Sequence, residues 1–106
     1  MKRQNVAEIR LTAARARELV RSIASDTANI QFTQHAQERM HERDIVDVDV
    51  FRVLRGGYVD DDPTPLEHDK WQCKVTLKIK GGRVAGVVTI ILLKGKLRIR
   101  TVEWED

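Results

Sequence analysis

The spacing of apolar and polar positions predicts helices in the first half of the chain. A helix is expected from about Thr12 to Ser25, with Thr12 as its N-cap. Its apolar stripe consists of Ala13, Ala16, Leu19, Val20 and Ile23. Alternating residues 29–32 predict a short strand, after which Thr33 stands where the N-cap of a helix over about 34–43 would lie.

A second short helix is predicted over about 47–55, since its apolar positions fall on one side. Gly56 or Gly57 would supply the left-handed position that commonly ends a helix. The segment 60–65 is expected to be a loop, because it contains three aspartates and two prolines.

The second half of the chain predicts strands. In residues 71–80 the odd positions are apolar and the even ones polar or basic, as in a half-buried strand with one wet, positive face. Gly81-Gly82 then predicts a hairpin turn. Residues 84–93 are apolar on both parities, which is typical of a strand covered on both faces. After a turn at Lys94-Gly95, residues 96–104 alternate again.

These elements predict an α+β fold: an N-terminal helix followed by a βααβββ core whose antiparallel sheet carries helices on one side. The 106 residues suffice for one hydrophobic core. We therefore expect a single compact domain, with residues 1–27 as a helical extension and 28–106 as the core.

The net charge of +3 hides an uneven distribution of acidic and basic residues along the chain. Residues 60–69 hold five acids and no lysine or arginine, whereas residues 70–100 hold no acid. The bases of that second segment are Lys70, Lys74, Lys78, Lys80, Arg83, Lys94, Lys96, Arg98 and Arg100. So basic a segment favours an anionic partner. The alternative is that the lysines serve solubility and protect sheet edges.

In the final strand, Trp104 has the parity of Arg98 and Arg100, so we expect it to be exposed.

Composition excludes several classes of protein. The single cysteine, Cys73, forms no internal disulfide, which favours a reducing, cytoplasmic location. The longest apolar run is too short to cross a bilayer, so no membrane association is expected. His35, His41, His68 and Cys73 lack a known ligand spacing, and we expect neither a metal nor a small-molecule cofactor.

The helix over 34–43 carries the best candidate for chemistry. His35, Arg39 and Arg43 are four residues apart and drift by only about 80° around a helix, so they share a face. The guanidinium group of an arginine can donate two parallel hydrogen bonds to phosphate oxygens. Histidine can accept and release a proton near neutral pH. The same spacing also occurs in an ordinary amphipathic helix with a polar stripe.

The stretch His35-Ala36-Gln37-Glu38-Arg39-Met40-His41-Glu42-Arg43-Asp44-Ile45 resembles the H-x-x-x-R-M-x-x-R-x-I signature of a bacterial family of small proteins with a domain of unknown function. Gly57 and Gly86-Val87-Val88-Thr89 fit the later part of that pattern. The resemblance covers about Phe32 to Leu93. In element order the family is similar to the RelE/barnase-like toxin nucleases.

The resemblance implies a metal-independent endoribonuclease of toxin type that is held by an antitoxin protein. Its site would combine His35, Arg39 and Arg43 with Thr89 projecting from the sheet. RNA would be gathered by basic strand residues, namely Lys74, Lys78, Lys80, Arg98 and Arg100. His35 would take the proton of a ribose 2′-OH as it attacks phosphorus. The acid for the leaving group stays open among Lys74, Lys78, Arg98 and His41.

Two alternatives remain. The protein could be a non-catalytic RNA- or ribosome-binding module that uses the same basic surface. It could also be a protein-interaction domain whose basic sheet meets an acidic partner such as an antitoxin.

Overall fold

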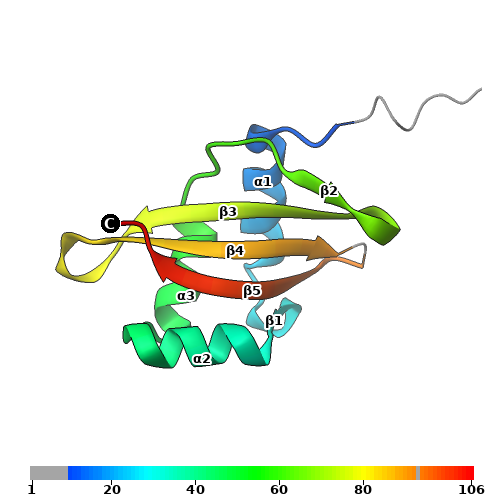
Figure 1. The fold of residues 1–106 in the computed structure, drawn as a ribbon. Coiled ribbons are helices and arrows are strands. Elements are labelled where there is room, and N and C mark those ends of the chain that lie inside the picture. The colour runs from blue at the N-terminus through cyan, green and yellow to red at the C-terminus, as the bar shows by residue number, and fades with distance from the viewer. Residues whose placement is uncertain (1–9, 93) are drawn as a thin grey trace, which may run out of the picture.

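Figure 1 shows the computed structural model, which describes residues 10–92 and 94–106. The first nine residues of the predicted N-terminal extension, and Leu93 of the predicted strand 84–93, lie outside the described residues. The helices are α1 (Ala13–Ile23), α2 (Gln34–Arg43) and α3 (Asp47–Gly56).

Both predicted N-caps are confirmed. The Thr12 hydroxyl oxygen accepts a hydrogen bond from the Arg15 N–H at 3.1 Å, and that of Thr33 accepts one from the Ala36 N–H at 3.0 Å. None of the described helices is long and apolar enough to cross a membrane.

The strands form one five-stranded sheet in the order β1-β5-β4-β3-β2. They are β1 (Ile30–Phe32), β2 (Thr64–Leu66), β3 (Lys70–Lys78), β4 (Val84–Leu92) and β5 (Lys96–Trp104). The α+β class is confirmed. The predicted loop 60–65 is partly wrong, because β2 pairs antiparallel with the start of β3.

The prediction of an antiparallel sheet is wrong at one edge, since β1 runs parallel to β5. Parallel neighbours need a long crossover between them. Here the chain passes through α2, α3 and three strands before β5 returns to lie beside β1. The sheet is therefore mixed, a property that depends on long-range pairing and not on local pattern.

The hydrophobic core lies on one face of the sheet, where α1 and α3 cover it (Figure 1). Val20 of α1, Leu54 of α3 and Val87 of β4 are among its fully buried side chains. Because side chains alternate along a strand, the residues between the buried ones point to the other face. We call this the open face. It carries Gln72, Lys74, Thr76 and Lys78 of β3, Val84, Gly86, Val88 and Ile90 of β4, and Arg98 and Glu103 of β5.

A β-bulge reverses the parity of β5. Ile99 lies opposite Thr89 while Thr101 lies opposite Val88, so Arg100 is an extra residue in β5. As a result Trp104 turns toward the helix-covered face, where it is half-buried against the core. The prediction that Trp104 is exposed is wrong for this reason.

Gly57 follows α3 without the predicted left-handed backbone, since its φ is −85°. The position needs glycine for space instead, because a Cβ there would lie 2.7 Å from the carbonyl oxygen of Thr76. Gly81 and Gly82 do take up positive φ, at 67° and 71°, and confirm the predicted turn between β3 and β4.

Candidate functional site

α2 is fixed along the outer edge of β5. At its start, the Thr33 N–H donates to the Ile99 carbonyl at 3.1 Å, and the Thr33 hydroxyl donates to the Arg100 carbonyl at 3.2 Å. At its end, Trp104 Nε1 donates to the Arg43 carbonyl at 3.0 Å. Figure 1 shows the helix lying beside β5. The face of α2 next to the core is therefore set by these bonds at both ends.

The buried residues of α2, Ala36 and Met40, determine where its polar row lies. Arg39 and Arg43 occupy the flank next to them, with 30% and 33% of their side chains exposed. His35 lies one turn earlier in the same row and is exposed. The structure thus keeps the predicted row on one flank of a helix at the edge of the sheet.

Glu42 joins the two arginines. Its carboxylate lies 2.7 Å from Arg39 Nη2 and 3.8 Å from Arg43 Nη1. The Glu42 carboxylate therefore offsets part of the positive charge of the two guanidinium groups.

Two nitrogen atoms of this pair lack a hydrogen-bond acceptor. Within the described residues, Arg39 Nε and Arg43 Nη1 are buried without a partner. A buried donor left unpaired costs about 1–3 kcal/mol, more when it is charged. Both nitrogens are covered by protein atoms and do not meet solvent.

Thr89 lies away from this flank, in the core. It is fully buried on the helix-covered face, opposite Cys73, and its hydroxyl donates to the Val87 carbonyl at 3.1 Å. The structure therefore does not bring Thr89 onto the open face, and its hydroxyl is already used inside the fold.

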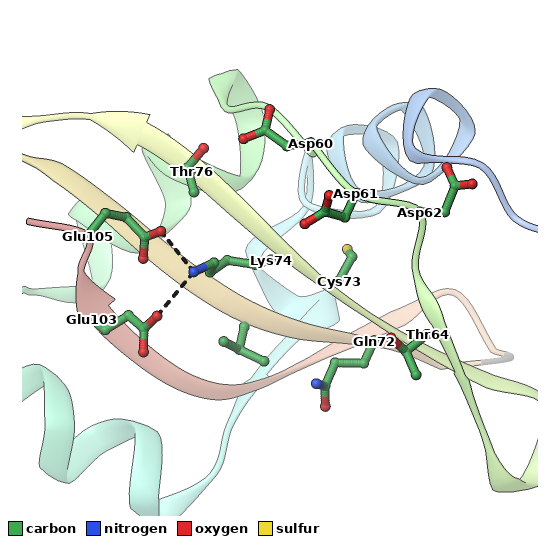
Figure 2. Close-up of a pocket in the computed structure, with 11 residues that line it drawn as sticks. Asp60, Asp61, Asp62, Thr64, Gln72, Cys73, Lys74, Thr76, Glu103 and Glu105 are labelled. Atoms are coloured by element: carbon green, nitrogen blue, oxygen red, sulfur yellow. Dashed lines mark hydrogen bonds and ion pairs between the residues drawn. The ribbon is translucent and has the colours of Figure 1, made fainter.

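Lys74 is the sheet cation with the most acidic surroundings. Its Nζ lies 2.8 Å from Glu105 and 3.3 Å from Glu103, and Figure 2 shows it between the two carboxylates. The hydrogen bond to Glu105, helped by Glu103, raises the pKa of Lys74 although partial burial opposes the rise. Lys74 is therefore a poor proton donor at neutral pH.

The other predicted RNA-binding residues differ among themselves. Lys80 forms an ion pair with Asp49 of α3 at 3.1 Å, and Arg100 donates to the side-chain oxygen of Gln72. Lys78 is exposed and Arg98 is half-buried, and neither has an ion-pair partner among the described residues. The five cations do not form one uniform positive surface.

A hollow of about 430 Å³ on the open face is predominantly acidic. Its lining includes the carboxylates of Asp60, Asp61, Asp62, Glu103 and Glu105 and the ammonium group of Lys74. Figure 2 shows the two glutamates next to that ammonium group, whereas Asp62 accepts a hydrogen bond from the Ala13 N–H. The sequence contained a signal for this, because three acids follow Arg100 directly at positions 103, 105 and 106. The basic segment 70–100 ends just before these acids.

Two further groups bear on chemistry. Burial raises the pKa of the Cys73 thiol to about 11, so the thiol stays protonated and is a weak nucleophile. Among the residues that the structure describes, no group of three His, Cys, Asp or Glu is placed to hold a metal ion.

Comparison with known protein families places the chain in one of them. Residues 32–104 match the family described as a domain of unknown function (DUF4258), and the chain belongs to this family. The match runs from the end of β1 through α2 to the last residue of β5, and it leaves out α1. No curated protein matches the chain, and no solved structure does.

Proposed function

We propose that the protein is a metal-independent endoribonuclease of toxin type and that the row on α2 binds the phosphodiester. One observation supports the proposal most: Arg39 and Arg43 lie one turn apart on the same flank of α2, with 30% and 33% of their side chains exposed, and among the described residues they share a single ion-pair partner, Glu42. A single guanidinium group can donate two parallel hydrogen bonds to phosphate oxygens, and the two arginines supply two such groups.

RNA is the proposed substrate for two reasons. The α2 sequence resembles a family that is similar in element order to RelE/barnase-like nucleases, and His35 stands exposed beside the two arginines. In the proposed mechanism the nucleophile is the ribose 2′-OH, which DNA lacks.

In the proposed reaction His35 takes the 2′-OH proton while the 2′-oxygen attacks the adjacent phosphorus. The bond from phosphorus to the 5′-oxygen breaks, and that oxygen leaves with a proton from water. The products are a 2′,3′-cyclic phosphate and a 5′-hydroxyl end. Arg39 and Arg43 stabilise the charge that grows on the phosphoryl oxygens, at about 3 kcal/mol for each donor in comparable sites.

Thr89 has no part in this scheme, because its hydroxyl is buried and bonded to Val87. Lys74 is also left out as the acid for the leaving group, since Glu105 and Glu103 hold its proton. His41 lies on the opposite flank of α2, in a groove with Gln37 and Glu38, which makes it a suitable control residue.

The test is cleavage of end-labelled single-stranded RNA by the wild type, with and without a chelator. We expect cleavage that the chelator leaves unchanged, that His35→Ala abolishes and that His41→Ala preserves. The same sequence made of 2′-deoxynucleotides should stay intact. Full activity in His35→Ala would refute the proposed base.

A second function, non-catalytic RNA binding, is favoured by the state of the sheet. Its central cation, Lys74, is paired with two carboxylates, and the described part of β5 holds no histidine or tyrosine to act as an acid. This function predicts RNA binding that weakens with salt, persists in His35→Ala and yields no product.

A further inference from the structure

The last turn of α2, which carries Arg43, is held by bonds from outside the helix. The Ile45 N–H donates to the carbonyl of Met40 at 2.9 Å. The carbonyl of Arg43 itself accepts from Trp104 Nε1 at 3.0 Å. The last four carbonyls of a helix have no partner within it. Trp104 therefore fixes the backbone at the position from which the Arg43 side chain starts.

The β-bulge in β5 brings Trp104 to this position. By simple alternation Trp104 would share the parity of Arg98 and point to the open face. The extra residue, Arg100, turns it to the helix-covered face instead. Because α2 and β5 run in the same direction, their ends lie side by side, and Trp104 meets Arg43 there (Figure 1). β-Bulges are frequent next to active sites, where they redirect a side chain.

The Trp104 ring is held in turn by Arg83, which directly precedes β4. The guanidinium carbon of Arg83 lies 4.2 Å from the centre of the ring, within the range of a cation–π contact. Arg83 also donates two hydrogen bonds to the carboxylate of Asp106, at 3.1 and 3.4 Å. Three contacts in series therefore join Asp106 to the backbone of Arg43.

We propose that Trp104 is a positioning residue for Arg43 and that Arg83 keeps Trp104 in place. This inference rests on the proposed function, because it concerns the same phosphate site. Trp104 contacts the backbone of Arg43 and not the substrate, so it acts through the direction of the guanidinium group. Donors stabilise a transition state when they are oriented before the reaction begins. A displacement of about 1 Å can lower a rate by about 100-fold.

The experiment is a double-mutant cycle on RNA cleavage. Trp104→Phe keeps an aromatic ring and removes the N–H that binds the Arg43 carbonyl. We expect it to lower kcat by about tenfold and to change KM by less than about threefold, because the oriented charge acts in the transition state. In an Arg43→Met background the same change should cost less than about twofold, since no guanidinium group remains to be positioned. In an Arg39→Met background the tenfold loss should persist.

Arg83 supplies a second test with a conservative rescue. Arg83→Gln removes the cation from the Trp104 ring and should lower kcat by about threefold. Arg83→Lys keeps a cation that can lie over the ring and should restore the rate. If Trp104→Phe fails to fold, the Arg83 pair repeats the cycle with Arg43→Met.

Val53→Ala is the control for a loss of stability alone. Val53 is fully buried in α3, so the change weakens the core without touching α2. Its kcat should equal that of the wild type at a temperature where circular dichroism shows both proteins folded.

Two failures can be told apart. A wild type that cleaves no RNA would refute the proposed function and this inference with it. A wild type that cleaves RNA, together with an equal loss from Trp104→Phe in the presence and absence of Arg43, would overturn this inference alone.

Discussion

The molecule has two cationic regions that differ in how their charges are satisfied. On α2, Arg39 and Arg43 share one carboxylate, Glu42, and each retains a buried nitrogen without an acceptor within the described residues. On the open face, Lys74 has two carboxylates of its own. The arginines of α2 are therefore less fully paired than Lys74, although the strands carry more basic residues.

The difference teaches that a count of basic residues along strands does not give the field above a sheet. Neighbouring strands bring distant residues together, and here β5 and the residues after it place acids beside β3. A helix, in contrast, sets the spacing of His35, Arg39 and Arg43 by its own geometry.

The largest effect is expected from removing the arginines. Arg39→Met with Arg43→Met should weaken binding of single-stranded RNA by about 100-fold, because two charge-assisted hydrogen bonds of about 1.5 kcal/mol each are lost. Fluorescence anisotropy with a labelled oligonucleotide measures this. Lys74→Met is the matched control and should change the affinity by less than about twofold. Equal losses in both variants would remove the distinction between the two regions.

Lys80 tests the same distinction through stability. Lys80→Met leaves the mostly buried Asp49 without its cation, and the free energy of unfolding should fall by about 1 kcal/mol at pH 7, since Lys80 is partly exposed. Affinity for RNA should stay unchanged. Denaturation in urea, followed by circular dichroism, gives the first value.

The pH dependence of that effect has a definite sign. Burial opposes ionisation of Asp49, but the Val46 N–H and Lys80 outweigh it and lower the pKa of Asp49 below 3.8. The charged carboxylate therefore contributes stability above its unfolded pKa of about 3.9, and the contribution is lost as the pH falls through the lower folded value. The difference between wild type and Lys80→Met should shrink over that acidic range. A difference that persists unchanged there would contradict the pairing.

Thr89 tests whether a residue of the core takes part in the proposed reaction. Thr89→Val removes one hydrogen bond inside the core and should change the free energy of unfolding by at most about 1 kcal/mol. RNA cleavage should be unaffected at a temperature where both proteins are folded. A selective loss of cleavage would show that Thr89 acts in the reaction.

The smallest effect is expected from neutralising one of the two carboxylates that pair with Lys74. Glu105→Gln removes one negative charge near a protonated lysine, and affinity for RNA should rise by at most about twofold at low salt. Thr76→Val, in the same hollow, leaves the charge unchanged and serves as control. A rise of tenfold or more would mean that the open face binds RNA directly.

Local patterns predicted most of the elements because each depends on nearby residues. Thr12 and Thr33 were readable as N-caps, and the hairpin at Gly81-Gly82 follows from its two glycines. The parallel pairing of β1 with β5 and the bulge at Arg100 depend on residues far apart in the chain. No local pattern contains that information.

One part of the candidate site could also be predicted from local sequence, and another part could not. The row on α2 could be predicted, since three positions at helical spacing must share a face. The partners of the sheet cations could not, because Lys80 meets Asp49 and Lys74 meets Glu105 only after the strands pair and the helices pack. Thr89 was misplaced because residues 84–93 are apolar on both parities and give no sign of which side faces the helices.

The most direct test of the account is an NMR titration of the arginine Nε–H signals with a 2′-deoxy oligonucleotide, which binds but lacks the attacking hydroxyl. We predict that the Arg39 signal shifts and saturates together with that of Arg43, while the Lys74 ammonium signal stays in place. Saturable binding that moves Lys74 and leaves Arg39 and Arg43 unchanged would contradict the assignment of the phosphate site to α2.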